Sequence, residues 1–155
     1  MLTAHLPSGY LVARAAPQYI PWLLPAALIG AVLSDFDMIF FHLVDNQSTH
    51  HHRYWVHIPL FWAVVAVICL PLLAWWDHLA TGVMFFVALA VHLLLDSIGG
   101  GILWAAPFDD HLYSLVTVPA TYGHWVISFV MHWTFLLELL IWGMALFVWY
   151  KERTP

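Results

Sequence analysis

The chain has 155 residues, of which 63% are hydrophobic and 8% are charged. Soluble domains carry about 25% charged residues, so this chain cannot cover a water-facing surface. Its four Lys and Arg residues exclude a nucleic-acid-binding footprint, and the single Cys69 excludes an internal disulfide and a Cys-rich zinc site. Ten Trp and six Tyr are typical of a protein with two membrane interfaces. Composition therefore predicts a single-domain, all-α, multi-pass integral membrane protein over residues 1–155.

Apolar segments in chain order predict about four membrane-crossing helices, because roughly 20 residues span the hydrocarbon core. They lie at about 17–33, 58–76, 79–95 and 125–150. Residues 3–15 predict a separate short helix that is too brief to cross. The first basic residue is Arg14 and the start of the chain, residues 1–5, lacks a charged region, so we expect no cleavable signal peptide.

The alternation of these helices predicts that His and Asp side chains gather at one membrane face. The first helix would deliver Asp35 and Asp37 to the side on which the second begins, just after His57. The third would return to that side and end at His92 and Asp96.

The basic residues predict the orientation of the bundle. Arg14, Lys151 and Arg153 fall on the side opposite the His/Asp cluster, and Arg53 falls on the side of the cluster. Because loops rich in Lys and Arg stay in the cytoplasm, we expect the basic side to be cytoplasmic and the cluster to face the periplasm or exterior.

The clearest metal-binding pattern is His92 and Asp96, four residues apart in an apolar segment. Residues at i and i+4 share a helix face, so both side chains can reach one ion. Imidazole and carboxylate are zinc ligands, and ionisable groups within apolar helices mark functional sites. The alternative is a His–Asp hydrogen bond that only holds helices together.

Asp35 and Asp37 form a second candidate pair at the end of the first apolar segment. Residues two apart differ by about 200° around a helix, so both carboxylates converge only if the helix ends there. We interpret Asp37 as a ligand and Asp35 as a bridging or outer group. The alternative, a polar helix terminus, is disfavoured because a carboxylate opposes the helix dipole at a C-terminus.

A run of histidines, His50–His52, precedes Arg53 and His57. Three adjacent side chains of a regular element cannot all bind one ion, so we favour His52 and His57 as ligands and leave His50 and His51 as outer or solvated groups. If the segment is helical, Arg53 shares a face with His57 and can hold a phosphate oxygen beside the metal. The alternative is a soluble His-rich loop.

Two residues do not fit the simple layout. His5 is a ligand only if residues 5–35 leave the cluster side and return as a hairpin, which conflicts with the four-span count; otherwise it is a solvated terminal residue. Glu138 is an acid within an apolar segment and needs a polar partner that the sequence does not identify.

Taken in order, these motifs resemble the YdjM-like family of LexA-regulated, membrane-bound proteins described as metal-dependent hydrolases. The resemblance covers about residues 3–108. The family's early His, Asp-x-Asp, His-Arg-x-x-x-His, His-x-x-x-Asp and Gly-rich stretch before Trp and Pro-Phe are matched by His5, Asp35, Asp37, His52, Arg53, His57, His92, Asp96, Gly100, Gly101, Trp104, Pro107 and Phe108. Met38, Tyr54 and Val56 depart from the family pattern, which leaves room for an altered substrate or metal count.

The order of Asp, His and His-x-x-x-Asp is also similar to zinc-dependent phospholipase C and P1-type nucleases, which implies phosphoester hydrolysis. We therefore expect a metal-dependent hydrolase of the bacterial inner membrane, with its metal site on the periplasmic face, acting on a small or lipid-linked phosphoester near membrane lipid. The expected cofactor is a divalent metal, most simply Zn²⁺, in one or more copies, and the expected catalytic residues are Asp35 and Arg53. The expected metal ligands are His5, Asp35, Asp37, His52, His57, His92 and Asp96.

Two other function classes remain open. His-rich loops between apolar helices also suit a di-iron membrane oxidase or hydroxylase, although the His-x-x-His-His boxes typical of such enzymes are absent from the sequence. A non-enzymatic metal carrier or sensor would need polar groups through the membrane, which the segment 58–76 does not provide.

Overall fold

The computed structural model describes residues 1 and 3–154, and within them it is all-α, as predicted, with an isolated bridge between Ile102 and Tyr113. In chain order its elements are α1 (His5–Arg14), α2 (Leu23–Val32), the 3₁₀ turn η1 (Ser34–Phe36), α3 (Asp37–Leu43), the 3₁₀ turns η2 (His51–Arg53) and η3 (Trp55–His57), α4 (Pro59–Trp75), α5 (Leu79–Gly99), α6 (Trp125–Val130) and α7 (Phe135–Arg153).

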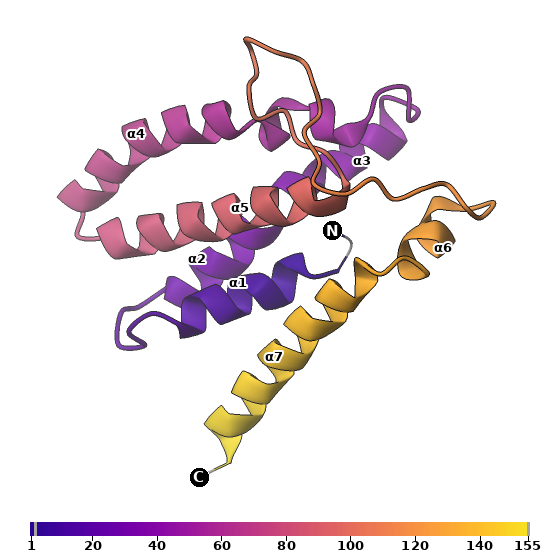
Figure 1. Cartoon of the computed structure of the whole chain (residues 1–155). Helices are drawn as coiled ribbons and strands as arrows, with labels where there is room; N and C mark the ends of the chain where they lie inside the picture. Colours follow the sequence, from indigo (N-terminus) through magenta and orange to yellow (C-terminus); the bar gives the residue numbers. More distant parts are fainter. Residues whose placement is uncertain (2, 155) are drawn as a thin grey trace.

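The first two helices form a hairpin that packs on α5 (Figure 1). The short helix expected over residues 3–15 is confirmed as α1, but α2 begins only at Leu23 rather than near residue 17. Two prolines and a left-handed Trp22, with φ of 65°, lie in the connection and delay the helix. The hairpin returns the chain, so His5 lies at the same end of the molecule as the C-terminus of α2.

Small residues let α2 approach its neighbours closely. A Cβ atom at Gly30 would collide with the backbone carbonyl of Phe85 on α5, and one at Gly9 of α1 would collide with Ala31. The buried core around this contact includes Ala27 and Ala88. Small side chains at helix interfaces bring backbones together, so carbonyl oxygens of α2 come within reach of side chains on α5.

Helices α4 and α5 form a second hairpin, which confirms the helices expected over 58–76 and 79–95. Pro59 occupies the first turn of α4, where its missing N–H has no helical partner to lose. Helix α5 continues four residues beyond the expected end, to Gly99. His92 and Asp96 therefore both lie within one helix and on one face.

The last predicted helix is broken. The sequence predicts one helix over 125–150, but α6 ends at Val130 and α7 starts at Phe135. Between them, Nδ1 of His132 lies 2.9 Å from Oγ1 of Thr134 and accepts a hydrogen bond from the Thr134 backbone N–H at 3.4 Å. Such local bonds compete with the helical pattern and interrupt it.

Length and apolar composition identify one candidate membrane span within residues 1 and 3–154, helix α5. A second candidate arises if α2 and the helical segment Ser34–Leu43, bent by 45° relative to each other, count as one span. Helix α4 is apolar but has 17 residues. Of the four crossings expected from the sequence, the described residues therefore support one, with a second candidate in the bent pair.

Candidate metal centre

The orientation of the His52 ring is fixed by the glycine-rich end of α5. Its Nδ1 atom lies 2.8 Å from the carbonyl oxygen of Gly101 and 3.1 Å from that of Gly100. A Cβ atom at Gly100 would overlap the His52 ring, and Gly101 has a φ of 73°, which favours glycine. Since a carbonyl can only accept, Nδ1 carries the proton, and the lone pair of His52 is on Nε2.

His57 and His92 are fixed in the same manner. Nδ1 of His57 donates to Oδ2 of the buried Asp37 at 2.7 Å. Nδ1 of His92 donates to the carbonyl oxygen of Ala31 at 2.8 Å, across the close contact of α2 and α5. Both imidazoles therefore present Nε2 as their free lone pair, the arrangement that orients metal-binding histidines.

The three Nε2 atoms converge on Asp96. Oδ2 of Asp96 lies 3.1 Å from His92, 3.6 Å from His52 and 3.7 Å from His57, measured to Nε2 in each case. The Nε2 atoms of His57 and His92 are 3.5 Å apart. All four residues are at most 4% exposed. The predicted meeting of groups that are distant in sequence is thus found at one end of the bundle.

The other oxygen of Asp96 faces the N-terminal segment. Oδ1 lies 3.1 Å from Nε2 of His5 and accepts a hydrogen bond from the Met1 amino group at 2.5 Å. The His5 ring stacks on His92 with centroids 4.0 Å apart. Oδ1 of Asp35 lies 3.8 Å from Nε2 of His92. One ligand atom from each of His5, Asp35, His92 and Asp96 fits within a 4.8 Å group.

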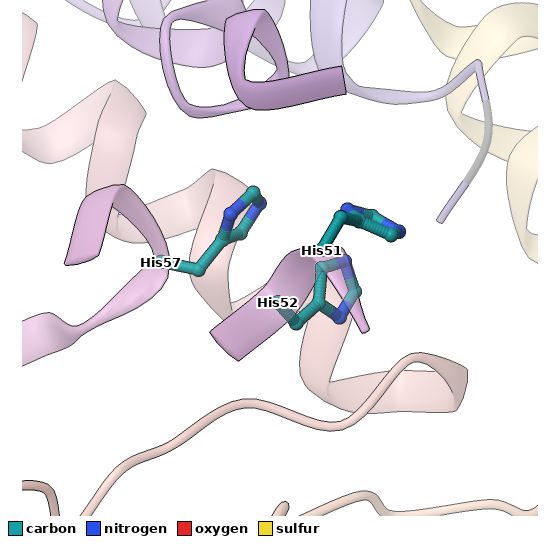
Figure 2. A group of neighbouring side chains, drawn as sticks. All are labelled: His51, His52 and His57. Carbon is teal, nitrogen blue, oxygen red and sulfur yellow. The ribbon is translucent and has the colours of Figure 1, made fainter. Parts of the chain in front are cut away.

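Sequence reasoning missed His51 as a member of the centre. One nitrogen each of His51, His52 and His57 also lies within a 4.8 Å group (Figure 2). Nδ1 of His51 is 3.9 Å from Oδ1 of Asp37. Adjacent residues can join one cluster here because η2 is a tight 3₁₀ turn followed by extended backbone at Tyr54, not a regular helix.

Burial keeps the loop histidines neutral. Desolvation lowers the pKa of His52 to about 3, although the nearby Asp96 carboxylate acts in the opposite direction. Desolvation also lowers the pKa of His51 to about 4. Both imidazoles are therefore unprotonated at pH 7, the form that binds metal ions.

The donor set fits a cation. Buried atoms that make no hydrogen bond within the described part of the chain include Oδ2 of Asp96, Oδ1 of Asp37 and Nδ1 of His51. Three imidazole lone pairs and a carboxylate oxygen facing one another repel unless positive charge lies among them. Unpaired buried polar atoms are costly, and a divalent metal ion would satisfy them together.

Two predicted residues lie outside this convergence. Asp37 does not face Asp96. Its Oδ2 atom accepts a hydrogen bond from His57 and orients that imidazole, so only Oδ1 remains available to bind an ion. Arg53 is exposed, and its side chain makes no hydrogen bond or ion pair with any residue that the structure describes. The expectation that it lies beside His57 rested on a helix, and that premise is wrong because Tyr54 is extended between η2 and η3.

A cavity of about 560 Å³ opens beside the centre. Asp35, His51 and His52 line its polar part. Val118, Trp125 and Phe129, from the connection after α5 and from α6, line an apolar part. The side chain of Asp35 is 37% exposed, so it faces both the cavity and the buried imidazoles.

One partner of Glu138, which the sequence could not name, is Thr3. Glu138 is fully buried on α7 and accepts hydrogen bonds at Oε2 from the Thr3 backbone N–H at 2.7 Å and hydroxyl at 2.6 Å. No sequence pattern links these residues, which are 135 positions apart.

Comparison with known proteins agrees with the membrane assignment. Residues 1–153 match the family described as YdjM inner membrane protein. The chain is 29% identical over 152 residues to the inner membrane protein YbcI of Escherichia coli (strain K12), covering 86% of each chain. No solved structure is significantly similar. Because the family match spans nearly the whole chain, the protein belongs to the YdjM family of inner membrane proteins.

Proposed function

We propose that the protein is a membrane-bound, metal-dependent hydrolase that cleaves a phosphoester at the membrane surface. The convergence of three imidazole Nε2 atoms on Oδ2 of Asp96 is the observation that carries this proposal. His52, His57, His92 and Asp96 would hold the ion, with His5, His51 and Asp37 available to complete or support its coordination. Imidazole and carboxylate ligands favour Zn²⁺.

A bound divalent metal lowers the pKa of a coordinated water toward neutrality and stabilises charge on a phosphoryl oxygen. In this proposal Asp35 acts as general base, which is supported by its position in the cavity lining and next to His92. The water oxygen bonds to phosphorus, the bond from phosphorus to the alcohol oxygen breaks, and Asp35 takes the water proton and returns it to the alcohol.

The cavity favours an amphiphilic substrate. The polar part adjoins Asp35 and His52, where the phosphoester would lie. The apolar part, at Trp125 and Phe129, would receive a lipid-like group and exclude water from the reacting end. A small phosphoester would use only the polar part. Arg53 has no role in this proposal, because it does not line the cavity.

The proposal includes four membrane crossings: α2 with the segment that follows it, α4, α5 and α7. Helix α1, about 15 Å long at 1.5 Å per residue, would pack against α2 and α5 and span only part of the membrane thickness. Arg14 pairs with Glu152, so it lies at the same end as Lys151 and Arg153, opposite the metal centre. A cytoplasmic location for this basic end makes the centre periplasmic.

The test is hydrolysis of a phosphoester panel, small and lipid-linked, by the purified protein with Zn²⁺. Asp35→Asn should lower kcat by roughly 10²–10⁴-fold, the usual contribution of a general base, while zinc content is kept. Asp110→Asn changes an exposed loop carboxylate and should leave kcat unchanged. No hydrolysis of any ester by the zinc-loaded wild type, or equal kcat in both variants, would contradict the proposal.

A further inference from the structure

We infer that Glu138 is a positioning residue that holds the N-terminal segment across the metal centre and so keeps His5 against Asp96. This inference extends the proposed metal site to a residue on α7, a helix that contributes no ligand to it. In Figure 1 the start of α7 and the N-terminus both lie near the C-terminal end of α5.

Two residues of α7 bind Thr3. Glu138 accepts two hydrogen bonds from it, at 2.7 Å from the backbone N–H and 2.6 Å from the hydroxyl. Trp142, one turn further along α7, donates its indole N–H to the Thr3 hydroxyl at 3.1 Å. Because the backbone N–H of Thr3 is bound as well as the hydroxyl, both the main chain and the side chain are fixed at this position.

Thr3 is two residues before His5, so its position limits where the imidazole can lie. His5 is 3% exposed, with Nε2 at 3.1 Å from Oδ1 of Asp96 and its ring stacked on His92. Fixing Thr3 therefore fixes one imidazole beside the central carboxylate. Outer partners that orient ligands in this way typically contribute 10–100-fold to metal affinity.

A second glutamate of α7, Glu152, joins that helix to α1 far from the centre and supplies a matched control. Glu152 on α7 binds the Tyr10 hydroxyl at 2.9 Å and Arg14 at 3.1 Å, both on α1. This contact is partly exposed and lies at the end of α1 remote from His5. Glu138 thus attaches α7 to Thr3 and Glu152 attaches it to α1, but of the two only Glu138 lies next to the centre.

The experiment measures the zinc Kd of the purified full chain by chelator competition. Glu138→Ala should raise Kd by roughly 10-fold, in line with other outer partners, and Glu138→Gln, which keeps an acceptor oxygen, should restore part of the affinity. Glu152→Ala should leave Kd unchanged. The double variant of Glu138→Ala with His5→Ala should have the same Kd as His5→Ala alone, because both changes act on the same contact, that of His5 with Asp96.

Equal Kd values for Glu138→Ala and Glu152→Ala, or effects of Glu138→Ala and His5→Ala that multiply, would overturn the inference. If the wild type binds no zinc, the proposed function fails, and hydrogen exchange of the Thr3 amide in the metal-free protein still decides the positioning role. Faster exchange in Glu138→Ala than in wild type and Glu152→Ala would support it, and identical exchange in all three would overturn it.

Discussion

The three imidazoles that face Oδ2 of Asp96 are each fixed by an oxygen acceptor on the far nitrogen: the Gly100 and Gly101 carbonyls for His52, Asp37 for His57, and the Ala31 carbonyl for His92. Three of these four acceptor oxygens are backbone atoms. They are supplied by positions where a small residue allows the chain to come close, and such positions control the centre without contributing a side chain to it.

Gly100 provides the residue-scale prediction. Gly100→Ala should weaken zinc binding by about 10-fold or more, because the added Cβ would displace the His52 ring from its carbonyl acceptors. Gly123→Ala is the matched control, since a Cβ at Gly123 has no atom within 4 Å. Competition titrations of both variants check this, and equal zinc affinity in the two would show that Gly100 does not position His52.

At this scale the sequence identifies residues whose chemistry is costly in an apolar chain. His92 and Asp96 are recognisable because ionisable groups rarely lie in apolar helices. His51 cannot be recognised in this way, because its place in the metal centre depends on a 3₁₀ turn whose backbone angles the sequence does not specify. The Ala31 carbonyl cannot be recognised from the sequence either. Every residue carries a backbone carbonyl, and only the packing of the helices decides which carbonyl reaches His92.

At the scale of elements, α2 is the support on which the centre depends. It packs against both α1 and α5, and its close contact with α5 at Gly30 brings the Ala31 carbonyl to His92. The α1–α2 hairpin also returns His5 to the centre. The spacing between these helices therefore sets the position of two imidazoles.

Gly30→Ala should destabilise the fold by about 1–3 kcal/mol, the usual cost of overpacking, and should also weaken zinc binding. Gly143→Ala is the control, because this helical glycine of α7 has open space at the Cβ position and should be neutral or up to about 1 kcal/mol more stable. Thermal unfolding in detergent measures both effects. A Gly30→Ala protein as stable as Gly143→Ala would contradict the close packing of α2 on α5.

The apolar runs of α4 and α5 predict those helices well, because their hydrophobic segments are bounded by the Trp76–His78 turn. The segment 125–150 does not predict its break at 131–134, because hydropathy is continuous there and the bonds between His132 and Thr134 are local polar contacts. From the sequence the α1–α2 hairpin is only the alternative in which His5 is a ligand, because the packing of both helices on α5, which supports it, is not visible in their own residues.

At the scale of the whole molecule, three of the four basic residues lie at the end opposite the metal centre. Arg14, Lys151 and Arg153 gather at one end, and the buried His and Asp groups at the other. This polarity follows from the alternating direction of the helices, and the proposed orientation in the membrane depends on it.

Cysteine labelling tests the orientation. In a background with Cys69→Ala, Thr49→Cys near the centre should react with a membrane-impermeant maleimide in intact cells. Thr154→Cys at the basic end should react only after the membrane is opened. Both positions are exposed, so access depends on the side of the membrane. Labelling of both from the same side would show that the two ends do not face opposite compartments.

The most direct measurement of the central claim is the zinc-to-protein ratio of the purified protein after dialysis, compared between wild type, Asp96→Asn and Asp77→Asn. Asp96 is the carboxylate on which the imidazoles converge, and Asp77 is an exposed residue in the turn between α4 and α5. The account predicts that wild type and Asp77→Asn retain zinc, whereas Asp96→Asn loses it but still unfolds cooperatively on heating. The same ratio in all three proteins, whether high or near zero, would contradict it.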